Sequence, residues 1–461
     1  MEYNEILILL MFASFIFLLF TGIQIGYVLG GVALLFTAIG QLSDIYFDTF
    51  TGLDFSLLPM ASERIYTVMN NWLLVSIPMF VFMGLMLDRS GIAERMMLAM
   101  GQAMGRVRGG LAISVTFIGV IMAASTGIVG ASVVLMAVLS LPTMLREGYS
   151  KTIATGTICA SGTLGVLIPP SIMLVVMADQ LSISVADLFM GSMVPGVILA
   201  ILYVVFLLVY GFLYPDRAPA AKNQEKLTIK IFWVLFKAII PPGFLILLVL
   251  GSIFAGIATP TEASGLGAAG ATLLAFMNRK LSWSAVKDVA QGTVRIVGFI
   301  FCIWISATLF ALVMRLLGGD ELIETTLTSL PFGPYGVVGI ILGAVFFLGF
   351  FLDWIEICLI VLPLLGPVVN NLGLDINGYG IVDQPALVWF TVLVAVTLQT
   401  SYLTPPVGPA IFFLQGVAPA EVKLIDIYKG VVPFIILQLI AIAIVLFFPN
   451  LVIWFPVYVY G

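Results

Sequence analysis

The segment Ile168-Pro169-Pro170-Ser171 interrupts an apolar stretch at 152–178, and Thr404-Pro405-Pro406-Val407 interrupts a second one at 386–414. Proline has no backbone N–H to donate, so two prolines in tandem stop a helix inside such a stretch. Glycines nearby allow the freed backbone to turn. We therefore predict two broken helices, at corresponding places in the two halves of the chain.

Two further apolar stretches, at about 109–145 and 335–370, are too long for one membrane span of about 20 residues. Each is interrupted midway, the first around Ser125–Gly130 and the second around Asp353–Glu356. Irregular backbone at membrane depth is tolerated where it is buried in protein or lines a cavity. The pattern predicts two re-entrant helical hairpins, which enter the membrane and turn back.

The composition places these elements in a lipid bilayer. Hydrophobic residues make up 61% of the 461-residue chain and charged residues 9%, whereas a soluble domain is about 45–50% apolar and about 25% charged. We predict an all-α polytopic membrane protein with further spans at 5–22, 24–42, 70–88, 188–213, 235–256, 259–277, 293–316 and 430–452. The amphipathic stretch Leu281–Gln291 predicts a helix on the cytoplasmic surface.

Charge and cysteine content narrow the function. The net charge of -5 gives no reason to expect a nucleic-acid partner, and the absence of histidine removes imidazole metal sites. Cys159, Cys302 and Cys358 lie far apart in apolar runs. They are either small buried hydrophobes or a disulfide pair with one free thiol.

The basic residues predict the orientation. With the N-terminus outside, all but two of the lysines and arginines fall on the cytoplasmic side, Arg64 and Arg315 being the exceptions. This holds only if each hairpin leaves the membrane on the side from which it entered. The first hairpin then opens from the cytoplasm, the second from outside, and both termini lie outside.

The two halves repeat each other weakly, in opposite orientations. Met86–Arg95 resembles Val313–Glu321, a hairpin and a broken helix follow in each half, and Met193–Gly196 then corresponds to Val431–Phe434. Inverted repeats with broken helices are typical of secondary transporters, whose solute site lies near the midplane. The predicted parts are N-terminal scaffold spans at 1–62, a first repeat at 63–214, a connector at 215–285 and a second repeat at 286–461.

Polar residues gather at the hairpin tips and at the broken helices. Carbonyls freed by proline and Ser/Thr hydroxyls can form an oxygen cage for a small hard cation, and half-helix N-termini can meet an anionic solute. The predicted solute contacts are Ser125, Thr126, Gly127, Ser161, Thr163, Pro170, Ser171, Thr400, Thr404 and Pro406. The predicted cation contacts are Ser125, Gly127, Gly162, Gly165, Asp353, Thr400, Ser401, Thr404 and Gly408.

Each of these residues has an alternative role. Small residues in membrane helices also serve helix packing. Asp353 is the sharpest single signal, because an acidic residue at membrane depth is costly and usually functional. Its alternative is a shallow hairpin that exposes the carboxylate to water.

Segments in a specific order resemble a known family. They are Gly22–Gly26, Asp88–Arg95, Gly109–Leu111, Ile168–Ile172, Val194–Gly196, Ala258–Ala263 and Leu403–Gly408. Over essentially the whole chain, this order is similar to the large membrane subunit of tripartite ATP-independent periplasmic (TRAP) transporters. The four polar segments match the segments that form the family's sodium sites.

The resemblance implies a sodium-driven carrier of the elevator type, not an enzyme, that imports small organic anions such as carboxylates. It implies a fold distantly similar to the divalent-anion/sodium symporters and a place in a bacterial or archaeal inner membrane, with both termini periplasmic. It also implies a periplasmic solute-binding protein and a small four-helix membrane subunit. No small-subunit segment precedes the first span, so that subunit is expected to be a separate chain.

Two departures from the family pattern leave the solute and the ion stoichiometry open. The first hairpin tip, Ser125–Ser132, lacks the acidic residue often found there, and Asp353 is followed by Trp354 and Glu356. One alternative is a stand-alone symporter of the divalent-anion/sodium type without partner subunits. Another is an intramembrane enzyme that uses Asp353 and Glu356 as its acid–base pair.

Overall fold

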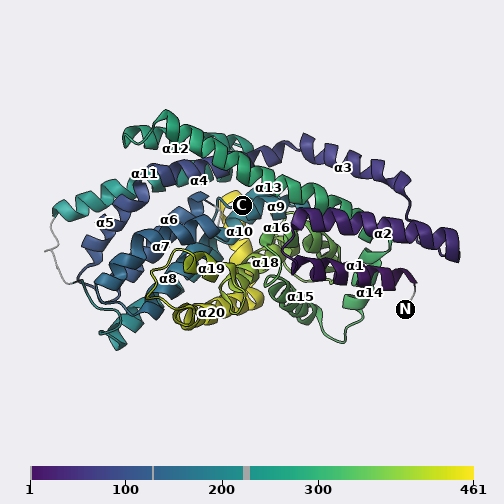
Figure 1. Cartoon of the computed structure of the whole chain (residues 1–461). Coiled ribbons are helices and arrows are strands. Elements are labelled where there is room, and N and C mark those ends of the chain that lie inside the picture. The colour runs from purple at the N-terminus through teal and green to yellow at the C-terminus, as the bar shows by residue number, and fades with distance from the viewer. Residues whose placement is uncertain (1–2, 127–128, 222–228) are drawn as a thin grey trace.

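The computed structural model describes residues 3–126, 129–221 and 229–461, and these parts contain helices and no β-strand (Figure 1). The α-helices are α1 Tyr3–Leu19, α2 Ile25–Phe47, α3 Leu58–Asn70, α4 Ser76–Arg89, α5 Ile92–Met104, α6 Gly110–Thr126, α7 Val129–Arg146, α8 Lys151–Thr163, α9 Ile172–Leu181, α10 Val185–Leu213, α11 Ile229–Phe254, α12 Pro260–Met277, α13 Trp283–Leu316, α14 Gly319–Thr328, α15 Pro334–Leu348, α16 Trp354–Glu356, α17 Leu362–Asn371, α18 Pro385–Leu403, α19 Pro409–Gln415, α20 Leu424–Phe447 and α21 Asn450–Tyr460. Short 3₁₀ turns lie at Phe55–Leu57, Trp72–Val75 and Leu164–Val166, and a π-helical turn lies at Ile357–Val361.

Among the described residues, nine helical segments are long and apolar enough to cross a membrane. They are Ile25–Phe47, Trp72–Arg89, Val129–Arg146, Val185–Leu213, Trp233–Phe254, Trp283–Leu316, Trp354–Asn371, Pro385–Leu403 and Leu424–Phe447. The chain is therefore a multi-pass membrane protein, as its composition predicts.

One predicted boundary is wrong. The surface helix expected at Leu281–Gln291 and the span expected from residue 293 form a single helix, α13, of 34 residues. At 1.5 Å per residue this helix is about 50 Å long, well beyond the ~30 Å hydrocarbon core. An amphipathic start followed by an apolar run marks a change of surroundings along one helix, and nothing in Val289–Val294 stops the helix between them.

Both predicted hairpins end their helices where the sequence is interrupted. In the first, α6 ends at Thr126 and α7 starts at Val129. In the second, α15 ends at Leu348, and α16 starts at Trp354 with the Asp353 side chain as its N-cap. The side of the membrane to which each hairpin opens stays a prediction.

Both broken helices are also present. The first passes from α8 through the 3₁₀ turn Leu164–Val166 to α9, and the second passes from α18 to α19. The peptide bonds Pro169–Pro170 and Pro405–Pro406 are both cis.

The order of elements from α4 to α10 recurs from α13 to α20. In each copy a glycine with positive φ, Gly91 or Gly318, separates the first two helices, and a hairpin and a broken helix follow. The copies also pack reciprocally: α9 of the first contacts α17 of the second hairpin, and α19 of the second contacts α7 of the first hairpin. The predicted domain limits stay predictions.

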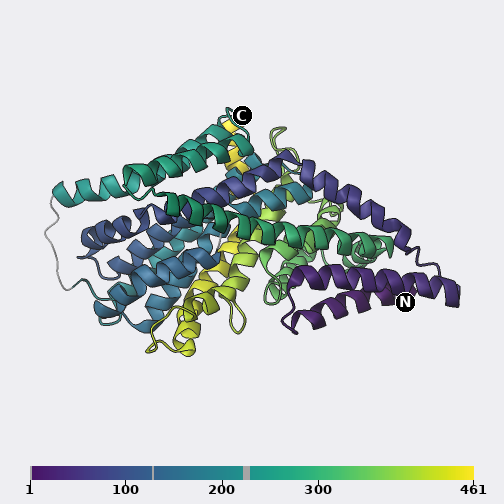
Figure 2. The same ribbon diagram turned by 45° about the horizontal axis from the view of Figure 1, so that its top comes forward.

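The helices form an elongated row beside a more compact body. In Figures 1 and 2, α3, α4, α11 and α12 run along one side of the molecule, while α6–α8, α19 and α20 lie together beside this row. Within the row α12 packs along α4. The long helix α13 packs against α4 of this row and also against α2. α18 lies in the interior, with every residue from Leu387 to Leu403 buried.

A close helix crossing holds the body together. Gly156 of α8 lies directly against Gly430 of α20, and a Cβ atom on Gly430 would lie 2.9 Å from the backbone nitrogen of Gly156. Helices in lipid gain stability from such close approach, which small residues permit. Cys159 and Cys358 are buried and Cys302 is exposed, all as free thiols, so the disulfide alternative is not realised.

Candidate functional site

The buried helix α18 ends in a run of hydroxyl side chains just before the second break. Thr400 Oγ1 donates to the carbonyl of Val396 at 2.8 Å, and Ser401 Oγ donates to the carbonyl of Leu398 at 2.8 Å. Thr404 Oγ1 donates to the carbonyl of Thr400 at 2.8 Å. Because each hydroxyl donates its hydrogen within the helix, each oxygen keeps lone pairs with which it can accept a hydrogen bond or coordinate a cation.

Asp353 ties the tip of the second hairpin to this helix end. The Asp353 carboxylate accepts a hydrogen bond from the backbone nitrogen of Trp354 at 2.8 Å and another from the hydroxyl of Tyr402. The Trp354 nitrogen also lies 2.7 Å from the Tyr402 hydroxyl oxygen. Asp353 is exposed, whereas Tyr402 is buried. A buried tyrosine therefore fixes the carboxylate at the surface of the hairpin tip.

A cavity of ≈ 810 Å³ lies at this tip and reaches the first hairpin. Asp353, Trp354 and Tyr402 line it together with Gly130 of α7 and Phe413 of α19. A Cβ atom on Gly130 would lie 3.0 Å from the ring of Phe413, so α7 of the first hairpin meets α19 of the second repeat here. Among the described residues that line the cavity, Asp353 carries the one charge.

The first broken helix packs between the arms of its own hairpin. Ser161 Oγ donates to Thr116 Oγ1 on α6 at 3.2 Å. A Cβ atom on Gly119 of α6 would lie 2.6 Å from Cβ of Ser161, and one on Gly162 would lie 3.0 Å from Cα of Val133 on α7. Glycine is thus required at both contacts for the helix to lie this deep between the two arms.

A hydrogen bond joins the two broken helices. Gln399 Nε2 of α18 donates to Thr163 Oγ1 of α8 at 3.5 Å, and both side chains are fully buried. These residues are 236 positions apart, as are Pro169 and Pro405. Equivalent positions of the two repeats therefore meet at the interface between them.

Glu356 is the second acidic residue of the hairpin tip, and it is fully buried. Neither of its carboxylate oxygens has a hydrogen-bond partner among the described residues. An ionised carboxylate without a partner is very costly in a low-dielectric interior. Glu356 therefore requires either a proton or a nearby cation.

The structure places the predicted site residues in two groups. The first group follows the first broken helix and is fully buried: Ser161, Gly162, Thr163, Gly165, Pro170 and Ser171. The second group surrounds the second break and the hairpin tip: Asp353, Thr400, Ser401, Thr404, Pro406 and Gly408. Ser125 and Thr126 lie at the C-terminal end of α6, where their side chains are outside the described part, and Gly127 is outside the described residues. Their roles as ligands stay predictions.

Three polar partners were not predicted as site residues: Thr116, Gln399 and Tyr402. The only available sequence signal for Tyr402 is its position between Ser401 and the proline break, which does not reveal that it reaches Asp353, 49 residues away. No group of three or more Asp, Glu, Cys or His side chains that could hold a metal ion occurs in the described parts. A cation at this site would therefore rely mainly on hydroxyl and backbone oxygens, beside at most two carboxylates, those of Asp353 and Glu356.

Two hairpins, two broken helices and a cavity between them define a membrane transport protein with the architecture of a secondary transporter. Residues 12–451 match the family model described as "Tripartite ATP-independent periplasmic transporter, DctM component", and the chain belongs to this family.

Two relatives support this membership, and one solved structure has a similar fold. The chain is 28% identical to a putative TRAP transporter large permease protein of Haemophilus influenzae, over 86% of this chain and 94% of that protein. It is 28% identical to the C4-dicarboxylate TRAP transporter large permease protein DctM of Pseudomonas aeruginosa, over 85% of this chain and 88% of that protein. Its fold is similar to that of the Alcanivorax borkumensis YdaH transporter, with a TM-score of 0.57, 13% identity, and coverage of 86% of this chain and 89% of the other.

Proposed function

We propose that this chain is the translocation subunit of a sodium-gradient-driven importer of small organic anions. The observation that carries the proposal is the cavity between the two hairpins, whose described lining holds a single charge, the Asp353 carboxylate. At about 4 Å and an effective dielectric constant of about 20, two like charges repel by about 4 kcal/mol. An anionic solute in this cavity would therefore bind about a thousandfold more weakly unless a cation neutralised Asp353.

Sodium is the cation that suits this arrangement. The second break, which Tyr402 joins to Asp353, offers the hydroxyls of Thr400, Ser401 and Thr404 and the carbonyls freed by the prolines, and these are hard oxygen ligands. A bound Na⁺ turns the repulsion between Asp353 and the solute into an attraction, so solute and ion are taken up together. The P. aeruginosa relative is named for C4-dicarboxylates, which supports a carboxylate or a similar anion as solute.

We further propose two partners. The family's description as tripartite supports two components beside this one. A small four-helix membrane subunit, as a separate chain, would cover exposed apolar side chains of α2, α3 and the segment between them, among them Phe47, Phe50 and Met69. A periplasmic solute-binding protein would dock on the outer loops near Glu321 and Tyr335, with the chain in the inner membrane and both termini periplasmic.

Reconstitution in liposomes tests the proposal. With the small subunit, the binding protein and an inward sodium gradient, we expect uptake of labelled dicarboxylate without ATP. An equal potassium gradient is the control and should give no uptake above background. Full-rate uptake by this chain alone would instead support the stand-alone symporter, and uptake that ignores the sodium gradient would contradict the coupling.

A further inference from the structure

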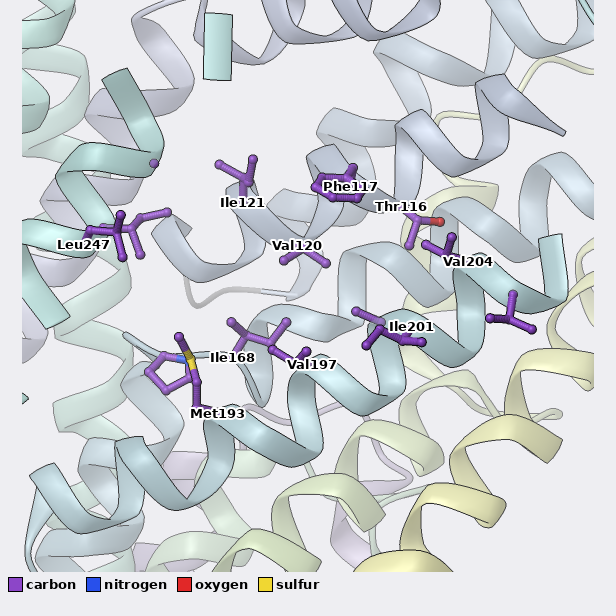
Figure 3. Close-up of a pocket in the computed structure, with 15 residues that line it drawn as sticks. Thr116, Phe117, Val120, Ile121, Ile168, Met193, Val197, Ile201, Val204 and Leu247 are labelled. Atoms are coloured by element: carbon purple, nitrogen blue, oxygen red, sulfur yellow. The ribbon is translucent and has the colours of Figure 1, made fainter. Parts of the chain in front are cut away.

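A second crevice, apart from the cavity between the hairpins, lies behind the first broken helix. It has a volume of ≈ 460 Å³ and is bounded by α6, α10, α11 and the segment Ile168–Pro169. In Figure 3, Phe117 and Val120 of α6 lie across the crevice from Val197 of α10, and Leu247 of α11 lies at its side. Its lining is apolar except for Thr116, whose hydroxyl donates to the Ala112 carbonyl at 3.2 Å and accepts from Ser161.

The side chains of the described residues do not fill this crevice. A Cβ atom on Gly243, in the α11 wall, would have no atom within 4 Å. Leu247 on the same wall is 68% exposed, and Ile201 on the opposite wall is 54% exposed. Both walls belong to helices that can span the membrane, so the medium that reaches the crevice is lipid. An apolar space without polar partners does not hold water. A hydrocarbon chain in the crevice makes dispersion contacts with lining atoms that would otherwise have no partner.

The exposed apolar surface continues from the crevice along both walls toward the basic connector. On α10 it runs through Leu208 and Phe212, and on α11 through Ile240 and Phe236, all of them exposed. About 13 Å of helix separates Val205, in the crevice, from Tyr214. This distance is close to the thickness of one leaflet of hydrocarbon, about 15 Å.

Cationic and aromatic side chains mark the end of this surface. The Arg217 guanidinium lies 5.4 Å from the centre of the Tyr214 ring, and the Lys237 ammonium lies 5.5 Å from the centre of the Trp233 ring. Aromatic rings with Lys or Arg are typical of the membrane interface, and clustered basic residues there attract anionic lipid headgroups.

We propose that this crevice binds an anionic phospholipid. One acyl chain lies between α6, α10 and α11 against Ile168 and Pro169, and the headgroup lies at Arg217 and Lys237. A helix of a partner subunit does not fit, since two turns of a helix about 10–12 Å across occupy more than ~800 Å³. The bound acyl chain separates α11 from the first broken helix, which carries Pro170 and Ser171. The lipid composition of the bilayer therefore affects the packing of this broken helix on the face that borders the crevice.

Photo-crosslinking of the full chain in nanodiscs tests the proposal. The probe is phosphatidylglycerol with a diazirine in one acyl chain, and labelled peptides are mapped by mass spectrometry. We expect labelling concentrated at residues 193–205 and 243–247. Gly243→Phe, which fills the crevice from α11, should abolish this labelling, and Ala200→Phe should do so from α10. Gly251→Phe is the matched control, because Gly251 lies on the same helix with no atom within 4 Å of an added Cβ, away from the crevice lining.

The headgroup part of the proposal has its own measurement. Lys237→Gln and Arg217→Gln should each lower labelling by about fivefold, as expected for loss of one cation near the headgroup. A phosphatidylcholine probe should label the crevice correspondingly less. Equal labelling of all lipid-facing helices, unchanged labelling in both crevice-filling variants, or equal labelling by the two probes would overturn the proposal. None of these results depends on transport, so they test the lipid site independently of the proposed function.

Discussion

The hydroxyl of Tyr402, at the end of α18, donates a hydrogen bond to the carboxylate of Asp353, at the tip of the second hairpin. The same hydroxyl oxygen lies 2.7 Å from the backbone nitrogen of Trp354. One buried side chain thus positions both the charge that faces the cavity and the first residue of the return arm. The second break and the hairpin tip are therefore expected to move together.

Tyr402→Phe removes this connection and keeps the ring. A hydrogen bond to a charged group contributes about 1.5–3 kcal/mol, so we expect the sodium concentration for half-maximal uptake to rise by about ten- to a hundredfold. Sodium titration of uptake in liposomes measures it. Tyr458→Phe, at an exposed tyrosine of α21, is the matched control and should leave the titration unchanged. An unaltered titration in Tyr402→Phe would show that the hydrogen bond does not organise the cation site.

Asp353→Asn separates charge from shape at the same position. The amide can still accept a hydrogen bond from Trp354, so we expect normal expression and folding. The charge that attracts a cation is lost, so uptake should depend only weakly on sodium. Uptake measured against external sodium, with expression level checked on a blot, decides the matter. Sodium activation equal to that of the unmodified chain would reduce Asp353 to a structural role.

The two acidic residues of the second hairpin tip, Asp353 and Glu356, should respond differently to replacement by their amides. Glu356 is fully buried with no hydrogen-bond partner for either oxygen in the described parts of the chain, and a neutral amide is less costly to bury than an ionised carboxylate. We expect Glu356→Gln to unfold in detergent at the same temperature as the unmodified chain or a higher one. Glu356→Lys is the contrasting variant and should fail to accumulate. A large loss of stability in Glu356→Gln would point to a cation held by this carboxylate.

The helix crossing of α8 and α20 should be the site most sensitive to small additions of volume. Gly430→Ala places a methyl group against the backbone of α8, and overpacking of this kind costs about 1–3 kcal/mol. Thermal unfolding in detergent should therefore occur at a lower temperature. Gly339→Ala provides the control, because nothing lies within 4 Å of a Cβ there and alanine is the better helix former. Equal shifts in the two variants would contradict the importance of the crossing.

The sequence predicts the positions where helices stop better than the contacts that those positions make. The tandem prolines at 169–170 and 405–406 end helices through local chemistry, which a sequence displays directly. The contacts Tyr402–Asp353 and Gln399–Thr163 join residues that are 49 and 236 positions apart, so they depend on the packing of whole helices. For the same reason the terminal helix α21 was not predicted: Asn450–Tyr460 holds 11 residues, too few to span a membrane, and packs against α10 and α18.

The inverted orientation of the two hairpins leads to the last prediction. The bias of Lys and Arg toward one side assigns the first tip to the cytoplasm and the second to the outside. Single cysteines at positions 126 and 354 report on this, once the exposed Cys302 has been replaced by serine. Cys159 and Cys358 are buried and should not react. In intact cells without a driving gradient, an impermeant thiol reagent added outside should modify the Trp354→Cys variant, which lines the cavity, and spare Thr126→Cys. Lysed cells supply the control, since both variants should then react. Labelling of Thr126→Cys from outside together with protection of Trp354→Cys would reverse the predicted orientation of both hairpins.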